Sequence, residues 1–168
     1  MGKRSVKKDK NIYQLSREAL DLTRDKASEQ MEYISADRIE KIESGRSLPH
    51  PDEILTMASC YKKPGLCNYY CSHECPIGIR YIPEVEDKDL PRIVLEMLAS
   101  LNMVEKERDR LIDIAVDGEI SEDEYKDFNS IRDKLVSLSH SVESLKLWIE
   151  NTIARGELDR EAMRQQEK

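Results

Sequence analysis

Four cysteines lie close together in the middle of the chain. They are Cys60, Cys67, Cys71 and Cys75, spaced C-x6-C-x3-C-x3-C and followed by Pro76. Thiolates are soft ligands that suit Zn²⁺ or an iron–sulfur cluster. A reducing compartment keeps such thiols from forming structural disulfides. The four residues therefore indicate a tetrathiolate metal site that holds zinc or an iron–sulfur cluster.

The spacing also allows a site without metal. Cys67, Cys71 and Cys75 follow each other at i, i+4 and i+8, so a continuous helix would place them on one face over roughly 12 Å. That span is too wide for one Zn²⁺ with Zn–S bonds of about 2.3 Å. A single zinc site therefore requires the helix to break before Cys75. Without a break, the cysteines are a packed stripe of small apolar side chains.

No arrangement typical of catalysis accompanies these cysteines. The chain has no glycine-rich phosphate loop, and its three histidines, His50, His73 and His140, are scattered. Most carboxylates recur at helical spacing, as expected for solvated helix faces. We therefore expect a protein that is not an enzyme.

Charge is distributed unevenly over the 168 residues, whose formal net charge is −7. Residues 1–50 hold 11 Lys and Arg against 9 Asp and Glu, and residues 81–168 hold 13 against 22. The N-terminal end is thus the only non-acidic end. Residues 1–10 are rich in lysine and predict a disordered basic arm that could contact phosphates. No signal peptide or membrane-spanning apolar run is seen, so we expect a cytoplasmic protein.

The segment Ile34 to Leu55 shows the clearest local structure. Ser35 suits a helix N-cap, and Ile39 and Ile42 share one side of the helix that follows. Gly45 suits the end of that helix, and Pro51 the first turn of the next one, which should run to Cys60. In that second helix Ile54, Leu55 and Ala58 form the predicted apolar side.

Two further helices are predicted upstream of this segment. Residues 12–22 form an amphipathic pattern with an inward side, and Thr23 caps a short helix that ends near Met31. The inward side of the first helix consists of Ile12, Leu15, Ala19 and Leu22. Four short helices within about fifty residues predict a compact helix-turn-helix domain.

These features resemble the lambda-repressor-like family of helix-turn-helix transcriptional regulators, also called the Cro/cI or xenobiotic-response-element type. The resemblance covers residues 11–60 and rests on Ile39-x-x-Ile42-Glu43-x-Gly45 followed by Pro49, together with Arg17 and Thr23. The chain departs from the family at the turn through Glu32 and Tyr33, which lacks the usual glycine.

The resemblance implies where duplex DNA would bind. Base-reading positions of the recognition helix map to Ala36, Asp37 and Lys41, which could contact a thymine methyl, a cytosine amino group and a guanine. Phosphate contacts are expected at the start of the second helix and around the recognition helix. The full predicted DNA-binding set is Thr23, Arg24, Ser35, Ala36, Asp37, Arg38, Lys41, Ser44 and Arg46. Asp37, Glu40 and Glu43 place three acids on the helix that faces the polyanion, which opposes binding.

The C-terminal half predicts a long antiparallel helical hairpin. Asp89 caps the first helix, with Pro91 in its opening turn, and a short turn precedes the second helix. The predicted seam of the first helix is Val94, Met97, Leu101, Val104, Leu111 and Ala115. That of the second is Phe128, Ile131, Leu135, Leu138, Val142, Leu145 and Ile149. Further apolar positions lie off this seam, so the hairpin either packs on the N-terminal domain or pairs with a second hairpin as a four-helix homodimer. The family resemblance implies the homodimer, because repressors of this fold usually read two half-sites as dimers.

The sequence therefore predicts an all-α protein with five regions. They are a basic arm (1–10), a helix-turn-helix domain (11–62), a cysteine-containing connector (63–87), a helical hairpin (88–155) and a flexible tail (156–168). The expected function is sequence-specific binding of double-stranded DNA by a dimeric transcriptional regulator. The alternative is a protein-interaction module that keeps the repressor fold without specific DNA binding.

Overall fold

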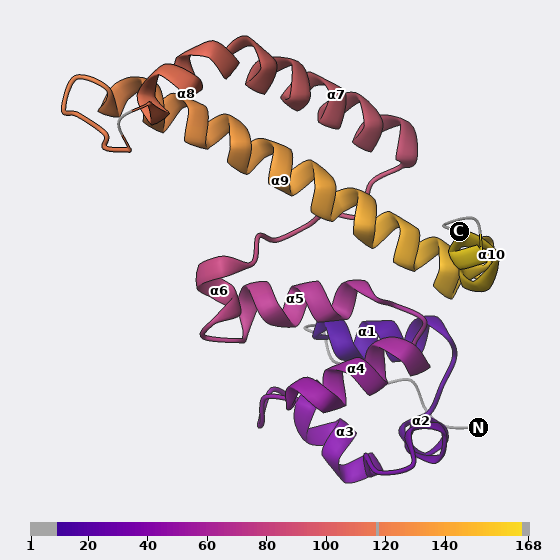
Figure 1. Ribbon diagram of the computed structural model, residues 1–168. Coiled ribbons are helices and arrows are strands. Elements are labelled where there is room, and N and C mark those ends of the chain that lie inside the picture. The colour runs from indigo at the N-terminus through magenta and orange to yellow at the C-terminus, as the bar shows by residue number, and fades with distance from the viewer. Residues whose placement is uncertain (1–9, 117, 166–168) are drawn as a thin grey trace. The chain divides into compact units, whose positions relative to one another are not determined.

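The computed structural model describes residues 10–116 and 118–165, and every regular element in these ranges is a helix (Figure 1). The all-α prediction is thus confirmed. The chain divides into two units: Met1–Glu84 with Glu150–Lys168, and Val85–Ile149. Within the described ranges, no helix combines the length and the apolar character needed to cross a membrane. The predicted basic arm lies outside these ranges except for Lys10, whose Nζ is 2.6 Å from Oε2 of Glu18.

Most helices of the first unit are short and capped. They are α1 (Ile12–Ala19), α2 (Arg24–Met31), α3 (Ala36–Glu43), α4 (Pro51–Cys60), α5 (Gly65–His73), α6 (Gly78–Tyr81) and α10 (Arg160–Gln165). The predicted caps are confirmed: Thr23 Oγ1 accepts the Lys26 N–H, and Ser35 Oγ accepts the Arg38 N–H, both at 3.2 Å. α10 occupies part of the tail that was expected to be flexible.

One apolar cluster holds α1 to α5 together. Its members come from all five helices and the turns between them: Tyr13, Ala27, Met31, Ile34, Ile39, Ile42, Ile54, Met57, Ala58, Tyr61 and Leu66. Leu66 is fully buried in this cluster, so α5 belongs to the same core as the four helices before it. The region predicted as a connector, residues 63–87, therefore begins as a fifth helix of the domain.

The predicted inward faces of two helices are wrong in part. Leu15 of α1 is 51% exposed, whereas Gln14 and Arg17 are buried in its place. Leu55 of α4 is 65% exposed, and Met57 is buried instead. In α1 the buried side is polar: Arg17 donates to Glu43, 26 positions away, and Gln14 donates to Glu18 on the same helix.

The turn after α5 is tight. α5 ends at His73, and α6 begins at Gly78, within the region that was predicted as a connector. A Cβ on Gly78 would lie 2.1 Å from the carbonyl oxygen of Cys71, so only glycine fits this approach. The backbone of α6 is thus packed directly on α5.

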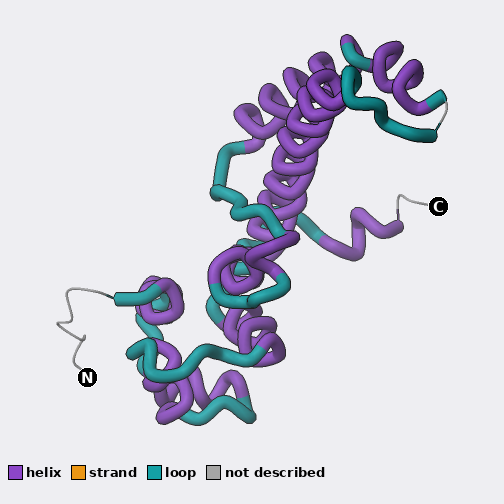
Figure 2. Tube along the Cα trace, turned by 90° about the vertical axis from the view of Figure 1, so that its left-hand side faces the viewer, coloured by secondary structure: helices purple, strands orange, loops and turns teal. Residues whose placement is uncertain are grey.

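The second unit is a pair of antiparallel helical arms. The chain runs through α7 (Leu90–Lys106) and α8 (Arg108–Ala115), then returns along α9 (Tyr125–Ala154), whose last residues belong to the first unit. The two arms lie side by side in Figure 1 and Figure 2. Lys134 Nζ of α9 pairs with Glu107 at 2.5 Å, and Arg110 Nε of α8 pairs with Asp127 at 2.8 Å. The first arm was predicted as one helix, but it breaks at Glu107, whose N–H donates to Val104.

The residues buried on the two arms differ in part from the predicted seam, although the predicted seam residue Ile131 is buried. Ile93, Ser100 and Ile114 are buried on the first arm, while Leu101, a predicted seam residue, is 44% exposed. The second arm buries Ile131, Ser141, Ser144 and Leu147. The three serine hydroxyls each donate to the carbonyl four residues earlier, which satisfies them inside the contact. A pattern that counts only apolar residues misses these positions.

Candidate nucleic-acid interface

The helix pair α2 and α3 carries the predicted DNA-binding residues. Thr23 and Arg24 stand at the start of α2, and Ser35, Ala36 and Asp37 at the start of α3. Both N-termini therefore offer backbone N–H groups that a phosphate could accept from, aided by the helix dipole. Lys41 follows one turn later on α3. Ser44 and Arg46 follow the end of that helix.

The turn between α2 and α3 is strained. Glu32 has φ 59° and ψ −54°, and the Tyr33 N–H donates to the Met31 carbonyl at 2.7 Å. This is a γ-turn of the rare positive-φ type. The Tyr33 hydroxyl contacts α4, where it donates to the carbonyl of Asp52 at 3.0 Å and bonds to Thr56. The Tyr33 side chain thus fixes this turn, which in the resembled family usually contains a glycine.

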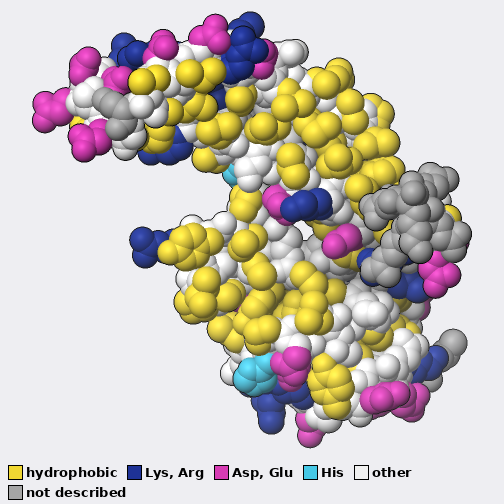
Figure 3. Space-filling model, in the orientation of Figure 1, with side chains coloured by type: hydrophobic (Ala, Val, Ile, Leu, Met, Phe, Trp, Pro, Cys, Tyr) yellow, Lys and Arg dark blue, Asp and Glu magenta, His cyan; other side chains and the backbone are white. Residues whose placement is uncertain are grey.

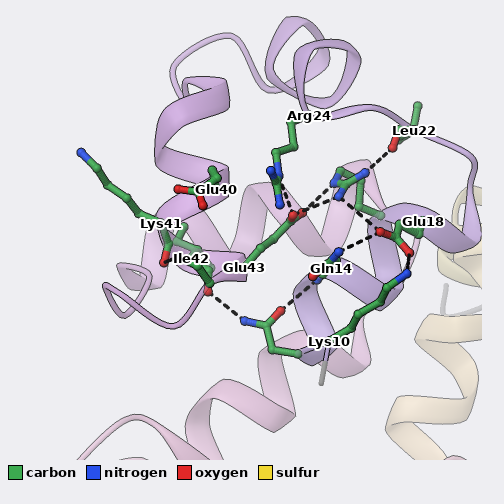
Figure 4. A network of polar contacts seen from close by, with 12 residues as sticks. Lys10, Gln14, Glu18, Leu22, Arg24, Glu40, Lys41, Ile42 and Glu43 are labelled. Carbon is green, nitrogen blue, oxygen red and sulfur yellow. Dashed lines mark hydrogen bonds and ion pairs between the residues drawn. The ribbon is translucent and has the colours of Figure 1, made fainter. Parts of the chain in front are cut away.

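A buried ion pair connects α1 to α3 (Figure 4). Arg17 donates twice to Glu43: Nε to Oε1 at 2.6 Å and Nη2 to Oε2 at 2.9 Å. Arg17 also donates to the carbonyl of Leu22. Burial alone would lower the pKa of Arg17, but its bonds to Glu43 raise it above the usual value. The two residues both belong to the motif that carries the family resemblance, and their contact fixes the rotation of α3 against α1.

Arg24 shares the same carboxylate from the other side. Its Nε lies 2.8 Å from Oε2 of Glu43, whose side chain has no exposed surface, while the Arg24 side chain is 35% exposed. One edge of the guanidinium is therefore held by a buried anion. Glu43 accordingly holds a predicted phosphate-contacting residue in place at the surface.

Arg38 is engaged inside the domain. It donates to both carboxylate oxygens of Glu53 at 2.6 Å, and also to Ser47 Oγ at 2.5 Å and to the Leu48 carbonyl at 2.9 Å. The hydrogen bonds from Arg38 hold the pKa of Glu53 below its usual value. Arg38 thus links α3 to the start of α4, although it was predicted as a DNA contact.

The solvent side of α3 carries few unpaired charges. Asp37 and Lys41 are exposed, and Lys41 extends away from the polar network (Figure 4). Glu40 forms an ion pair with Arg46, whose Nε also donates to Ser44 Oγ at 3.0 Å. Of the three acids expected to oppose DNA, Glu43 is buried and Glu40 is paired. Only Asp37 presents its charge to solvent without an ion-pair partner in the described ranges.

The cysteines lie in two separate surroundings. Cys60 at the end of α4 donates its S–H to Gln30 Oε1 at 3.2 Å, on a shallow depression of about 420 Å³. Its other lining residues are Leu55, Thr56 and Ser59. Cys67 and Cys71 lie on α5, and burial raises the pKa of both thiols. These thiols stay protonated near neutral pH, so a metal would have to displace their protons.

The helix break required for a single zinc site is present, because α5 ends at His73 and Cys75 follows its C-cap. Cys75 Sγ instead accepts the Gly78 N–H at 3.5 Å. Among the residues that the structure describes, no three His, Cys, Asp or Glu side chains are grouped closely enough to hold a metal ion. The zinc and iron–sulfur assignments to Cys60, Cys67, Cys71 and Cys75 stay predictions.

Two ion pairs at this surface were not predicted from the sequence. The pairing of Glu40 with Arg46 joins residues six positions apart across the end of α3, and that of Arg24 with Glu43 joins residues on different helices. The first has a local signal, since opposite charges flank Gly45. The second has none, because it depends on how α2 packs against α3.

Comparison of the chain with protein-family models, curated proteins and solved structures yields no match. Its function must therefore be inferred from its own residues and their geometry.

Proposed function

We propose that the protein is a sequence-specific DNA-binding transcriptional regulator that acts as a homodimer. The observation that carries the proposal is the fixed presentation of α3. Its inner side is held by Ile39, Ile42 and Glu43, all buried, while Asp37 and Lys41 face solvent. Insertion of such a helix into the major groove is the usual way in which helix-turn-helix domains read bases.

Phosphate contacts in this proposal come from both sides of α3. Arg24, held by Glu43, and the capped N-terminus of α2 would contact one phosphate group. The N-terminus of α3 with Ser35 would contact a second phosphate. In a sequence-specific complex, Ser44 with Arg46 beyond the other end of α3 would contact a third. Such contacts position the protein, and the side chains of Ala36, Asp37 and Lys41 then determine which bases are accepted.

The hairpin supplies a surface for the second copy. Large apolar side chains on its outer side are well exposed, and Figure 3 shows apolar atoms gathered over α7 and α9. The exposed members include Leu95, Leu98 and Leu101 on α7, and Leu135 and Val142 on α9. Exposed apolar surface of this extent is typical of an interaction site. A homodimer would carry two α3 helices, one from each copy, for the two half-sites of an operator.

The test of this function is selection of binding sites from a random duplex library, with reduced full-length protein at moderate salt. Recovery of a repeated, roughly palindromic sequence supports a dimeric regulator. Lys41→Gln should then relax the preference at one base position, which corresponds to about 1–3 kcal/mol of lost discrimination. Lys106→Gln removes the same charge at the end of α7 and serves as the control, with an unchanged preference expected. Recovery of no sequence by folded protein would contradict the proposal.

Dimerisation has a separate test. The mass of the full chain, measured by light scattering after size exclusion, should be that of two copies. Leu98→Glu together with Leu101→Glu should reduce it to one copy, because both side chains are already partly in water and the change removes apolar contact area. A monomeric wild-type chain would exclude the hairpin as a self-association surface.

A further inference from the structure

Glu40 and Arg46 form an ion pair at the surface, whereas the Arg17–Glu43 pair is buried. The Arg46 and Glu40 side chains are 61% and 35% exposed. Exposed ion pairs typically stabilise a protein by no more than about 1 kcal/mol. Arg46 can therefore change its partner at little cost to the fold.

The alternative partner would be a DNA phosphate. A guanidinium donates equally well to a carboxylate and to a phosphate, and both accept two parallel N–H groups. Glu40 is on the solvent side of α3, and Ser44, which also accepts from Arg46, lies at the C-cap of that helix. Arg46 is thus held beside α3 by two acceptors that belong to the helix itself.

Arg24 provides the contrast within the same domain. Its carboxylate partner Glu43 is fully buried and also bonded by Arg17, so it stays in place whether DNA is bound or not. The bond uses Nε of Arg24. Arg24 thus has a fixed anionic partner, whereas the anionic partner of Arg46 is partly exposed to solvent and to any ligand that approaches α3.

We propose that Glu40 competes with the DNA backbone for Arg46 and thereby limits non-specific binding to duplex DNA. This inference rests on the proposed function of α3. In a non-specific complex, where no base contact fixes the position of a phosphate, Arg46 stays on Glu40 and neutralises no phosphate. Glu40 is then a residue that sets specificity, because it lowers affinity for sequences that α3 does not read.

The size of the effect follows from counterion release. Each additional phosphate neutralised on B-form DNA steepens the slope of log K against log salt by about 0.9. One extra contact therefore raises affinity about eightfold at 0.1 M salt and about threefold at 0.3 M salt. Loss of an unpaired negative charge without a new phosphate contact raises affinity but leaves the slope unchanged.

The experiment measures binding of the full-length protein to a fluorescent 24-base-pair duplex of mixed sequence, by anisotropy, from about 0.05 to 0.3 M KCl. Four proteins are compared: wild type, Glu40→Gln, Arg46→Gln and the double variant. Asp37→Asn is the matched control, since it removes an exposed carboxylate from the same helix. Thermal melting followed by circular dichroism confirms that each variant is folded.

The expected result is a slope about 0.9 steeper for Glu40→Gln, an unchanged slope for Arg46→Gln alone, and a return to the wild-type slope in the double variant. Asp37→Asn should raise affinity without a change in slope. The inference is overturned if Glu40→Gln and Asp37→Asn behave alike, or if Arg46→Gln alone flattens the slope, because Arg46 would then already contact phosphate. Absence of salt-dependent binding by every protein would instead refute DNA binding itself.

Discussion

Replacement of Glu32 by glycine should stabilise the domain. Glu32 is the central residue of the turn between α2 and α3, with φ 59° and ψ −54°. Side chains with a Cβ rarely adopt this conformation, and such a residue typically costs about 1–3 kcal/mol. The Glu32 side chain is exposed, and its N–H bond to the Ser28 carbonyl at 3.1 Å is a backbone bond that glycine keeps. The substitution therefore relieves strain without removing a side-chain contact of the described structure.

The gain is partly offset in the unfolded state. Glycine has more conformational freedom to lose on folding, which costs roughly 0.5–1 kcal/mol relative to alanine. The net expectation is a rise of about 1 kcal/mol in the free energy of unfolding, within a range of about 0–2.5 kcal/mol. For a unit of this size, 1 kcal/mol corresponds to roughly 4–8 °C in Tm.

The measurement is urea denaturation of the full-length protein followed by circular dichroism, with Tm as a second readout. Glu29→Gly is the control, because Glu29 is an exposed residue inside α2 and glycine there should cost about 1 kcal/mol. Glu32→Ala retains a Cβ and should give little of the gain. If Glu32→Gly lowers stability as much as Glu29→Gly does, the turn is not strained and the reasoning is refuted.

Two further predictions concern the ion pairs. Because Arg38 holds the pKa of Glu53 below its usual value, their contact stabilises the protein above the unfolded pKa of about 4.3, and this stability is lost as the pH falls through the folded pKa. In urea titrations from about pH 3 to 7, the free energy of unfolding of Glu53→Gln should therefore fall less at acid pH than that of the wild type. Equal pH dependence of the two proteins would contradict this role of the Arg38–Glu53 contact. Arg17→Met should lower the free energy of unfolding by about 3–5 kcal/mol, since Glu43 then keeps only part of its neutralisation inside the core. Adding Glu43→Leu should recover much of that loss, and a double variant less stable than Arg17→Met would show that the pair is not the cause.

Local signals predicted where several helices begin or end, although α5, α6, α10 and the break between α7 and α8 were not predicted. Ser35, Thr23 and Asp89 each accept the backbone N–H three residues later, as the sequence predicted for N-caps. Gly45 has φ 73°, as predicted for a residue that ends a helix. These features depend only on residues within one turn, so a side chain and its neighbours suffice to predict them.

Which side of a helix is buried was predicted less well. In α1 the apolar pattern pointed Leu15 inward, but the core side is taken by Gln14 and Arg17. Arg17 is buried because Glu43 lies against it, and these two residues are 26 positions apart in the sequence. Hydrophobic periodicity assigns both to the surface. The contact exists only once α1 and α3 are packed, so no local pattern contains it.

The three acids of α3 show why the site was harder to predict than the fold. In the sequence, Asp37, Glu40 and Glu43 are equivalent charges on one short helix, and together they argue against binding to a polyanion. In the structure Glu43 is buried between two arginines, Glu40 is matched by Arg46, and Asp37 lies in the first turn, where the positive end of the helix dipole partly offsets its charge. With Lys41 added, the exposed side of α3 is close to neutral. The number of acidic residues on a helix therefore says little about the electrostatic potential at its surface. The partner of each carboxylate determines whether that carboxylate repels an approaching phosphate.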